Sequence, residues 1–203
     1  MLVLHGIVKS RAFRVMCAAA EMGVALERRD MGFGPGASQS PEFRKINPFG
    51  AVPALSDGDF NLAETAAIIL YLAKNHAKGW YPSDPKAEAR VWQWAFFAYT
   101  DLERPQIQVS QHTAMLPEDK RIPAVAEAGR TALARVYGFL DATLASQPYL
   151  SGDRLGLADL LVGTVAFTAL LMKFDLSPYP HFKAWLEGLA ARPAIAECIK
   201  QRG

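Results

Sequence analysis

Three polar residues lie at the starts of stretches that are expected to be helical, at positions where a side chain can bind a ligand. Ser10 precedes RAFRVMCAAAEMG, and Glu64 and Thr65 open ETAAIILYLAKN. A hydroxyl and the first free N–H groups of a helix bind a carboxylate well, because the positive end of the helix dipole lies there. The same residue types also cap helices without binding anything, and serine is among the best N-caps. The residues alone leave both roles open.

A proline inside an apparent strand is the second unusual feature. The stretch AVPAL (51–55) reads as a buried strand, yet Pro53 near its middle has no N–H to donate to a sheet. Proline is normally confined to strand edges, strand starts and bulges. A core strand therefore needs a particular reason to keep Pro53, and a plain edge strand is the alternative.

The cysteines and histidines predict no metal site and no cofactor. The two cysteines form no CxxC motif, and the four histidines are far apart without metal-ligand spacing. Cys17 lies in a predicted helix beside three alanines and is expected to be a small core residue. A reducing cytosol is the expected compartment. The residues concerned are Cys17, Cys198, His5, His76, His112 and His181.

Composition indicates an ordinary globular protein. Hydrophobic residues make up 51% and charged residues 21% of the 203 residues, with a net charge of +2. The basic residues are scattered, which argues against nucleic acid or an anionic membrane as the main partner. The opening residues do not resemble a secretory segment. Polar residues interrupt the longest apolar run, 155–172, which favours a buried helix over a membrane span.

The elements that must position these residues begin with alternating strands and helices. We expect strands at 2–6, 24–31, 51–55 and 60–63, the last two joined by an Asp-Gly hairpin. Helical spacing predicts helices at 11–23, from Pro41, and at 64–75. A loop rich in Gly, Pro and Ser fills 32–40. The order is βαβα followed by ββα, so the first strands are parallel and the hairpin adds an antiparallel one.

Beyond residue 76 the pattern becomes helical. We expect an α/β domain at 1–76, a Pro/Gly linker at 77–85 and an all-helical domain at 86–203. Apolar residues share one face at 124–147 and at 181–192. Aromatic residues cover all sides of the helix expected at 86–104, so some must be core and others are expected to face a ligand or a partner subunit: Trp92, Trp94, Phe96, Phe97 and Tyr99.

The sequence as a whole resembles the cytosolic glutathione S-transferases. The resemblance rests on NPFGAVPAL, DGDFNLAET and AAIILYLA in the first domain, and on YLSGDRLGLADLLV and PHFKAWLEGLAARPA in the second. The opening LHGIVKSRAFRV is most similar to the theta and phi classes, in which a serine follows the first strand. The resemblance implies a thioredoxin-like N-terminal domain with a cis-proline, followed by an all-helical C-terminal domain.

The resemblance also assigns roles to the residues above. Pro53 would be the cis-proline that leaves the backbone of Val52 free to pair with the cysteinyl part of glutathione, as in strand addition. Glu64 and Thr65 would hold the ammonium and carboxylate of the γ-glutamyl group. Ser10 would donate its O–H to the glutathione sulfur and favour the thiolate. Arg14, one turn further, either adds positive charge or is simply solvated.

Two positions depart from the family pattern. Theta- and phi-like enzymes often carry His or Lys before PEF to hold the glycyl carboxylate, and here the matching residues are the neutral Ser38 and Gln39. The residue before VP is often Gln or Lys, and here it is Ala51. Either glutathione binds weakly, or the missing charge comes from another residue of the first domain: Lys9, Arg11 or Arg44.

The implied activity is attack of the glutathione thiolate on a small hydrophobic electrophile, with glutathione as co-substrate, no metal, and a cytoplasmic homodimer that serves detoxification. The 64–75 and 86–104 helices are the expected dimer contact. One alternative is a non-catalytic binding or assembly module, since RAFR is also similar to the transferase-like domain of an elongation factor subunit. Another is a glutathione-dependent isomerase or dehalogenase, although the Ser-Ser-Cys pattern of the zeta class is absent.

One structural motif is expected in the second domain. In GLAD (156–159), Gly156 stands where the family usually has a serine, and Asp159 would accept a hydrogen bond from the Gly156 N–H in a capping box. Glycine is a tolerable N-cap. Gly156→Ser is therefore expected to be neutral or slightly stabilising, and Asp159→Ala to cost on the order of 1 kcal/mol or more.

Overall fold

The chain forms two compact units in a computed structural model that describes residues 1–32, 34 and 36–202. The first unit comprises Met1–Pro82 with the C-terminal segment from Ala191, and the second comprises Ser83–Ala190. Phe33 and Pro35 of the loop expected at 32–40 lie outside the described residues.

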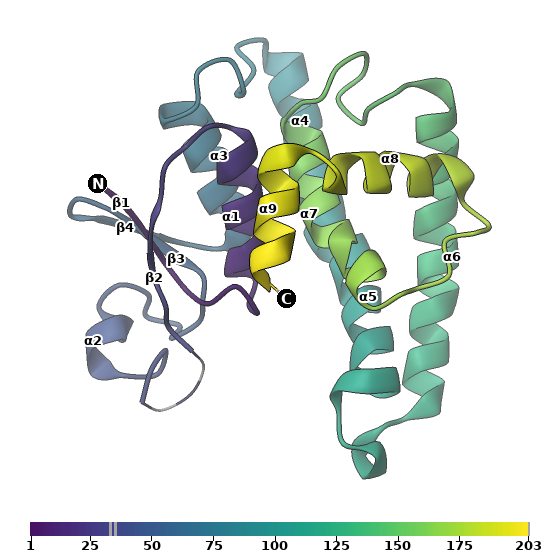
Figure 1. Cartoon of the computed structure of the whole chain (residues 1–203), viewed down its shortest axis with the longest axis horizontal. Helices are drawn as coiled ribbons and strands as arrows, with labels where there is room; N and C mark the ends of the chain where they lie inside the picture. Colours follow the sequence, from purple (N-terminus) through teal and green to yellow (C-terminus); the bar gives the residue numbers. More distant parts are fainter. Residues whose placement is uncertain (33, 35, 203) are drawn as a thin grey trace. The chain divides into compact units, whose positions relative to one another are not determined.

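A four-stranded mixed sheet forms the centre of the first unit (Figure 1). Its strands are β1 (Leu2–His5), β2 (Glu27–Arg29), β3 (Ala54–Asp57) and β4 (Phe60–Ala63), in the order β2-β1-β3-β4. β1 pairs in parallel with β2 and antiparallel with β3, which pairs antiparallel with β4. The predicted thioredoxin-like topology is confirmed.

The observed strands are shorter than the sequence pattern predicted. The expected strand 24–31 is reduced to β2, and β3 begins at Ala54 rather than at residue 51. The Val52–Pro53 peptide bond is cis, as the family resemblance implied. Pro53 therefore precedes the ladder and removes no hydrogen bond from it, which answers why an apparent core strand contains a proline.

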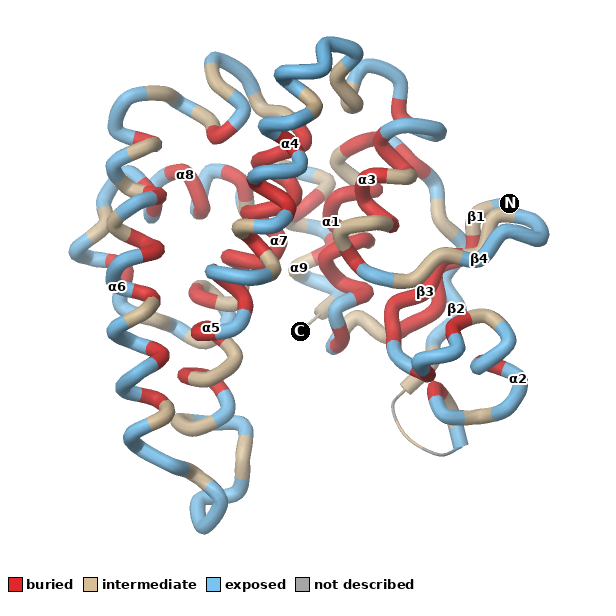
Figure 2. Tube along the Cα trace, turned by 180° about the vertical axis from the view of Figure 1, so that it is seen from behind, coloured by how far each residue is buried: buried red, intermediate tan, exposed pale blue. Residues whose placement is uncertain are grey.

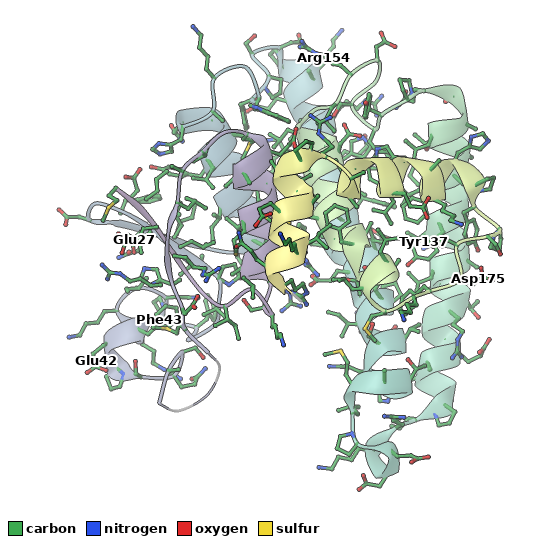
Figure 3. The ribbon with its side chains drawn as sticks, in the orientation of Figure 1. Glu27, Glu42, Phe43, Tyr137, Arg154 and Asp175 are labelled. Carbon is green, nitrogen blue, oxygen red and sulfur yellow. The ribbon has the colours of Figure 1, made fainter. Side chains whose placement is uncertain are left out.

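Helices cover the sheet because their apolar faces need burial. Helices α1 (Ala12–Glu21) and α3 (Thr65–Asn75) lie side by side on one side of the sheet, and the short α2 (Pro41–Arg44) lies apart from them (Figures 1 and 2). In Figure 2 much of the tube along α1 and α3 is red, which marks buried residues, and it is interrupted by less buried positions. Phe43 of α2, labelled in Figure 3, packs in a hydrophobic cluster that also contains Val52 and Ala54.

The last helix belongs to the first unit. Helix α9 (Pro193–Arg202) packs against α1, whereas the sequence pattern predicted a helical domain that extends over 86–203. Its apolar residues Ile195 and Cys198 are buried there. The α9 sequence has helical spacing like its neighbours, so periodicity alone does not reveal which unit it joins.

The second unit is all-helical, as predicted. A long helical segment runs through α4 (Pro85–Phe97), a π-helical turn η1 (Ala98–Leu102), α5 (Glu103–Ser110) and a second π-helical turn η2 (Gln111–Met115). Pro105 lacks the N–H of a regular helix, and the π-helical turn before it accommodates that loss. A 3₁₀ turn η3 (Glu118–Lys120) leads into α6 (Pro123–Ser146), α7 (Leu157–Leu171) and α8 (Pro180–Ala190).

The aromatic residues of α4 divide as expected. Trp94 is buried against Phe97 and Phe139, whereas Trp92 and Phe96 are exposed. Among the described residues, no helix combines the length and the apolar character needed to cross a membrane.

Asp159 at the start of α7 makes the predicted capping box and also accepts hydrogen bonds from outside the helix. Its carboxylate accepts from the Gly156 N–H at 3.0 Å, and also from the Leu150 N–H at 2.8 Å and the Trp185 indole N–H at 3.0 Å. The side chain is fully buried. Asp159 therefore joins the loop before α7 to α8, a wider role than a helix cap.

Candidate functional site

The strand register places most of the predicted site residues at one edge of the sheet. His5 pairs with Ala54, and Ala54 pairs with Ala63. The segments just beyond these pairs carry Ser10, Val52 and Glu64, at the edge where β1 and β4 end and β3 begins. This edge is the candidate site, and it lies entirely within the first unit.

Ser10 lies in the turn between β1 and α1 and is 8% exposed. Its Oγ donates to the Ile7 carbonyl at 2.7 Å and accepts from the Ala12 N–H at 3.1 Å. The N-cap residue of α1 is Arg11, whose side chain makes no capping hydrogen bond. Ser10 thus precedes the N-cap residue, and its hydroxyl accepts a hydrogen bond from one N–H of the first turn of α1. This structural role is compatible with a chemical role.

Gly6 allows the Ser10 turn to approach the cis-proline segment closely. Gly6 has a φ of 143°, and a Cβ atom there would lie 2.7 Å from the Ala12 Cβ, 3.3 Å from the Ser10 Oγ and 3.4 Å from the Val52 Cβ. Ser10 and Val52 therefore both lie beside Gly6. Only glycine tolerates this combination of positive φ and close contact.

Asn47 shapes the turn that leads to Val52. Its side-chain amide donates to the Ala51 carbonyl at 2.7 Å and its carbonyl oxygen accepts from the Phe49 N–H at 3.2 Å. This Asx-type turn fixes the backbone just before the cis bond. Asn47 is not among the residues predicted from the sequence, although the Asn-Pro pair at 47–48 is a turn signature that indicates it.

Glu64 has the least relaxed backbone at this edge. It is the N-cap of α3 with φ 70° and ψ 120°, and its side chain makes no capping hydrogen bond. A glutamate in the left-handed region costs of the order of 1 kcal/mol or more, and such strain concentrates at ligand sites. The exposed Glu64 carboxylate is therefore held beside the N-terminus of α3, with Thr65, 4% exposed, as the first helical residue.

The 38–44 loop joins this edge through Gln39. The Gln39 amide donates to the Gly50 carbonyl at 2.7 Å, and its oxygen accepts from the Arg44 guanidinium. Ser38 is buried, with its hydroxyl accepting from the Gly34 N–H at 3.3 Å. The exposed cation that this loop presents is thus Arg44, which Gln39 links to Gly50, two residues before Val52 along the chain.

Other polar residues predicted as candidates are internal. Arg14 is 8% exposed, so it is not a solvated arginine. Cys17 is fully buried, and its thiol is hydrogen-bonded to that of Cys198. His5 hydrogen-bonds to the Ser56 hydroxyl at 3.0 Å, and burial together with the Arg29 charge lowers its pKa. Among the described residues, no cluster of His, Cys, Asp and Glu is arranged to hold a metal ion.

Comparisons with known proteins identify both units. Residues 1–74 match the glutathione S-transferase N-terminal domain and residues 105–193 match the C-terminal domain. Glutathione S-transferase 4 of Zea mays is 33% identical over 89% of this chain and 83% of its own length. Glutathione S-transferase theta-1 of Bos taurus is 35% identical over 88% of this chain and 76% of its own length.

A solved structure resembles the fold over nearly its full length. The theta class glutathione S-transferase of Xanthomonas axonopodis pv. citri, crystallised with glutathione bound, superposes with a TM-score of 0.89 at 30% identity. The match covers 98% of this chain and 96% of the other. The two family domains, the curated relatives and the shared fold agree, and the chain belongs to the cytosolic glutathione S-transferase family.

Proposed function

We propose that this chain conjugates glutathione to small hydrophobic electrophiles through the glutathione sulfur, with Ser10 donating a hydrogen bond to that sulfur. The observation that carries the proposal is the meeting of the Ser10 turn, the Val52–Pro53 segment and the strained Glu64 at one edge of the sheet. The membership in a transferase family supplies the reaction class.

The edge offers one partner for each part of glutathione. Val52 precedes the β3 ladder, and its backbone suits the cysteinyl residue as an added strand. The Glu64 carboxylate suits the γ-glutamyl ammonium, and the Thr65 hydroxyl with the first N–H groups of α3 suits the γ-glutamyl carboxylate. This set holds the co-substrate without a covalent bond to the protein.

Ser10 activates the thiol by stabilising its anion. In this structure the Ser10 hydrogen is directed to the Ile7 carbonyl, and it would turn to the sulfur when glutathione binds. A thiolate is a stronger acceptor than a neutral carbonyl, because hydrogen bonds to charged groups are about twice as strong. The positive potential at the N-terminus of α1 also favours the thiolate. The thiol proton is released to solvent as the thiolate forms. The thiolate then attacks the electrophile to form a new bond from sulfur to the electrophilic atom, and the leaving group departs with the electron pair of the bond that breaks.

Arg44 is the proposed partner of the glycyl carboxylate. The two neutral residues at the usual basic positions are used elsewhere, since Ser38 is buried and both polar atoms of Gln39 are hydrogen-bonded. Gln39 holds the Arg44 guanidinium close to the Gly50 carbonyl. Arg44 therefore supplies the charge that the family pattern lacks.

A homodimer completes the proposal. Trp92 is 41% exposed and Phe96 is 64% exposed, and their rings lie 6.1 Å apart on α4. These two exposed rings are apolar surface that a partner subunit would cover, and α4 lies within the predicted dimer contact. Sedimentation of the wild type should give a dimer and Phe96→Glu a monomer; a wild-type monomer at micromolar concentration would contradict this. The cytoplasm stays the predicted location.

Calorimetric titration with glutathione, followed by conjugation of 1-chloro-2,4-dinitrobenzene, tests the function. We expect one site per chain, with Glu64→Gln weakening binding about 10- to 100-fold because a charge-assisted hydrogen bond is lost. Glu187→Gln, an exposed glutamate of α8, is the matched control and should bind as wild type. Glutathione binding without any rate acceleration would replace the transferase proposal with the non-catalytic module.

A further inference from the structure

The C-terminal helix α9 lies antiparallel along α1, with contacts at both ends and in the middle (Figure 1). At its start, Arg192 pairs with the Glu21 carboxylate at 2.5 Å. In the middle, the Cys198 thiol is hydrogen-bonded to that of Cys17. At its end, Arg202 reaches the segment that precedes α1. The order of these contacts runs backward along α1, from its last turn to its first.

Arg202 makes two different contacts at the N-terminal end of α1. Its guanidinium donates a hydrogen bond to the Val8 carbonyl, 194 residues away in sequence. The same guanidinium lies 4.8 Å from the centre of the Phe13 ring, in a cation–π contact. Val8 belongs to the turn that carries Ser10, and Phe13 belongs to the first turn of α1. Arg202 therefore ties these two segments together.

The hydrogen bonds that Ser10 makes within this segment are local in sequence. The Ser10 N–H donates to the Ile7 carbonyl at 2.9 Å, and the Ser10 hydroxyl uses the same carbonyl. Two further bonds join Ser10 to the start of α1: the Ala12 N–H donates to the Ser10 hydroxyl at 3.1 Å, and the Phe13 N–H donates to the Ser10 carbonyl at 3.2 Å. All of these partners lie within three residues of Ser10, so the bonds set the shape of the junction between the turn and α1. The hydrogen bond from Arg202 to Val8 comes from a separate helix and anchors the turn to the rest of the unit.

We propose that Arg202 is a positioning residue for the transferase reaction: from the end of α9 it fixes the Val8–Ser10 turn so that the Ser10 hydroxyl is directed at the glutathione sulfur. This inference rests on the proposed role of Ser10. Through Arg202, α9 would then help to position a reactive group, a role that the helical spacing of α9 did not predict.

The charges of Arg202 and its neighbour Arg14 support the same role for Arg202. Burial and the neighbouring Arg14 guanidinium lower the pKa of Arg202, although an arginine stays protonated at any ordinary pH. Arg14 lies in the first turn of α1 and Arg202 contacts Phe13 of the same turn, so two cations lie at the N-terminal end of α1. Their potential favours an anion at the sulfur, and Arg202 contributes to that field as well as to the geometry.

Three variants separate positioning from simple attachment of α9. Arg202→Met removes the hydrogen bond and the charge but keeps much of the side-chain volume. Arg202→Lys restores a cation that can reach the Val8 carbonyl. Arg192→Met is the matched control, because it removes an arginine contact at the opposite end of the same helix. Each variant is characterised as the full chain by thermal melting, amide hydrogen exchange and thiolate absorbance with bound glutathione.

We expect Arg202→Met to speed amide exchange at Ser10 and Ala12 and to lower kcat about 3- to 10-fold near neutral pH, with the KM for glutathione changing less than about twofold. The pKa of the bound thiol should rise, and Arg202→Lys should recover most of both effects. Arg192→Met should lower the melting temperature without changing the thiol pKa or the exchange at Ser10.

Unchanged exchange at Ser10 in Arg202→Met would overturn the inference, as would an equal rise of the thiol pKa in Arg192→Met. If Arg202→Met does not fold, Arg202→Gln, which removes the charge and shortens the side chain, takes its place with the same expected and contradicting results. A wild-type protein whose bound thiol titrates like free glutathione would instead refute the proposed role of Ser10. Faster Ser10 exchange in that case would still support the positioning contact, so the two failures are distinguishable.

Discussion

The starts of α7 and α3 both present an acidic side chain near a helix N-terminus, yet the two are arranged oppositely. Asp159 of α7 is fully buried and accepts hydrogen bonds from Leu150, Gly156 and Trp185. Glu64 of α3 is exposed, makes no capping bond and has a φ of 70°. An acid at a helix start is therefore not a sufficient sign of function.

The difference lies in which groups satisfy the carboxylate. At α7 the protein provides every partner, so the acid stabilises the fold. At α3 the backbone bears a conformational cost and the carboxylate stays available to a ligand, as expected where strain is retained for binding. Substitutions at the two helix starts should accordingly affect stability in opposite directions.

Asp159→Ala should give the largest effect. It leaves at least two buried donors, the Leu150 N–H and the Trp185 indole N–H, without their acceptor, and each such loss costs about 1–3 kcal/mol. We expect the free energy of unfolding to fall by about 3–5 kcal/mol. Denaturant unfolding measures this, with Asp159→Asn, which keeps one acceptor oxygen, as the milder comparison. A loss below about 1 kcal/mol would mean that the bonds around Asp159 contribute little.

Glu64→Gly should separate stability from binding. Glycine adopts a φ of 70° without strain, so the free energy of unfolding should rise by about 1 kcal/mol. Glutathione affinity should nevertheless fall about 10- to 100-fold, because the carboxylate is gone. Glu64→Ala loses the carboxylate but keeps the strain, and it should bind as poorly without the gain. Stability that is equal in both variants would remove the strain argument.

Gly156→Ser is now expected to destabilise, contrary to the prediction from sequence. A Cβ atom at Gly156 would lie 2.5 Å from the Ser151 Oγ and 2.8 Å from the Ser151 Cβ. The loop must shift to admit it, at a cost of roughly 1 kcal/mol. Ser151→Gly removes both clashing atoms, so the double variant should recover the wild-type melting temperature. Additive losses in the double variant would show that the clash is not the cause.

The site edge also contains a polar group that the fold does not fully satisfy. His5 is buried with no hydrogen-bond partner at Nδ1 among the described residues, and burial and Arg29 lower its pKa. Above pH of about 6.5 both folded and unfolded chains are neutral at this residue. As the pH falls below that value the unfolded chain binds the proton first, so stability should decrease. His5→Gln should flatten that part of the stability curve, and an unchanged slope would assign it to other groups.

Much of the fold follows from local sequence. Helical spacing and the Asp-Gly turn predicted the topology of the first unit, and motif resemblance predicted the cis bond at Pro53. The sequence pattern could not show that α9 joins the first unit, because its partners on α1 lie more than 170 residues away along the chain. Such pairing depends on tertiary packing, which periodicity does not encode.

The site was predicted less completely than the fold. Residue types pointed to Ser10, Val52, Glu64 and Thr65, whose segments the strand register brings to one edge. The sequence did not reveal that Ser38 is buried and that both polar atoms of Gln39 are hydrogen-bonded. Those facts depend on where Gly34, Arg44 and Gly50 lie in space. The positive φ of Glu64 was equally invisible, since a glutamate gives no sign of a left-handed backbone.

The central claim is that Ser10 stabilises the glutathione thiolate, and thiolate absorbance against pH tests it most directly. A hydrogen bond to a charged group is worth about 1.5–3 kcal/mol, so the bound thiol pKa in wild type should lie about one to two units below the free value of about 8.5. In Ser10→Ala the curve should return toward the free value, while glutathione affinity stays within a few-fold of wild type. Coinciding curves in an active wild type and in Ser10→Ala would contradict the account and leave Ser10 as a residue that only shapes the turn before α1.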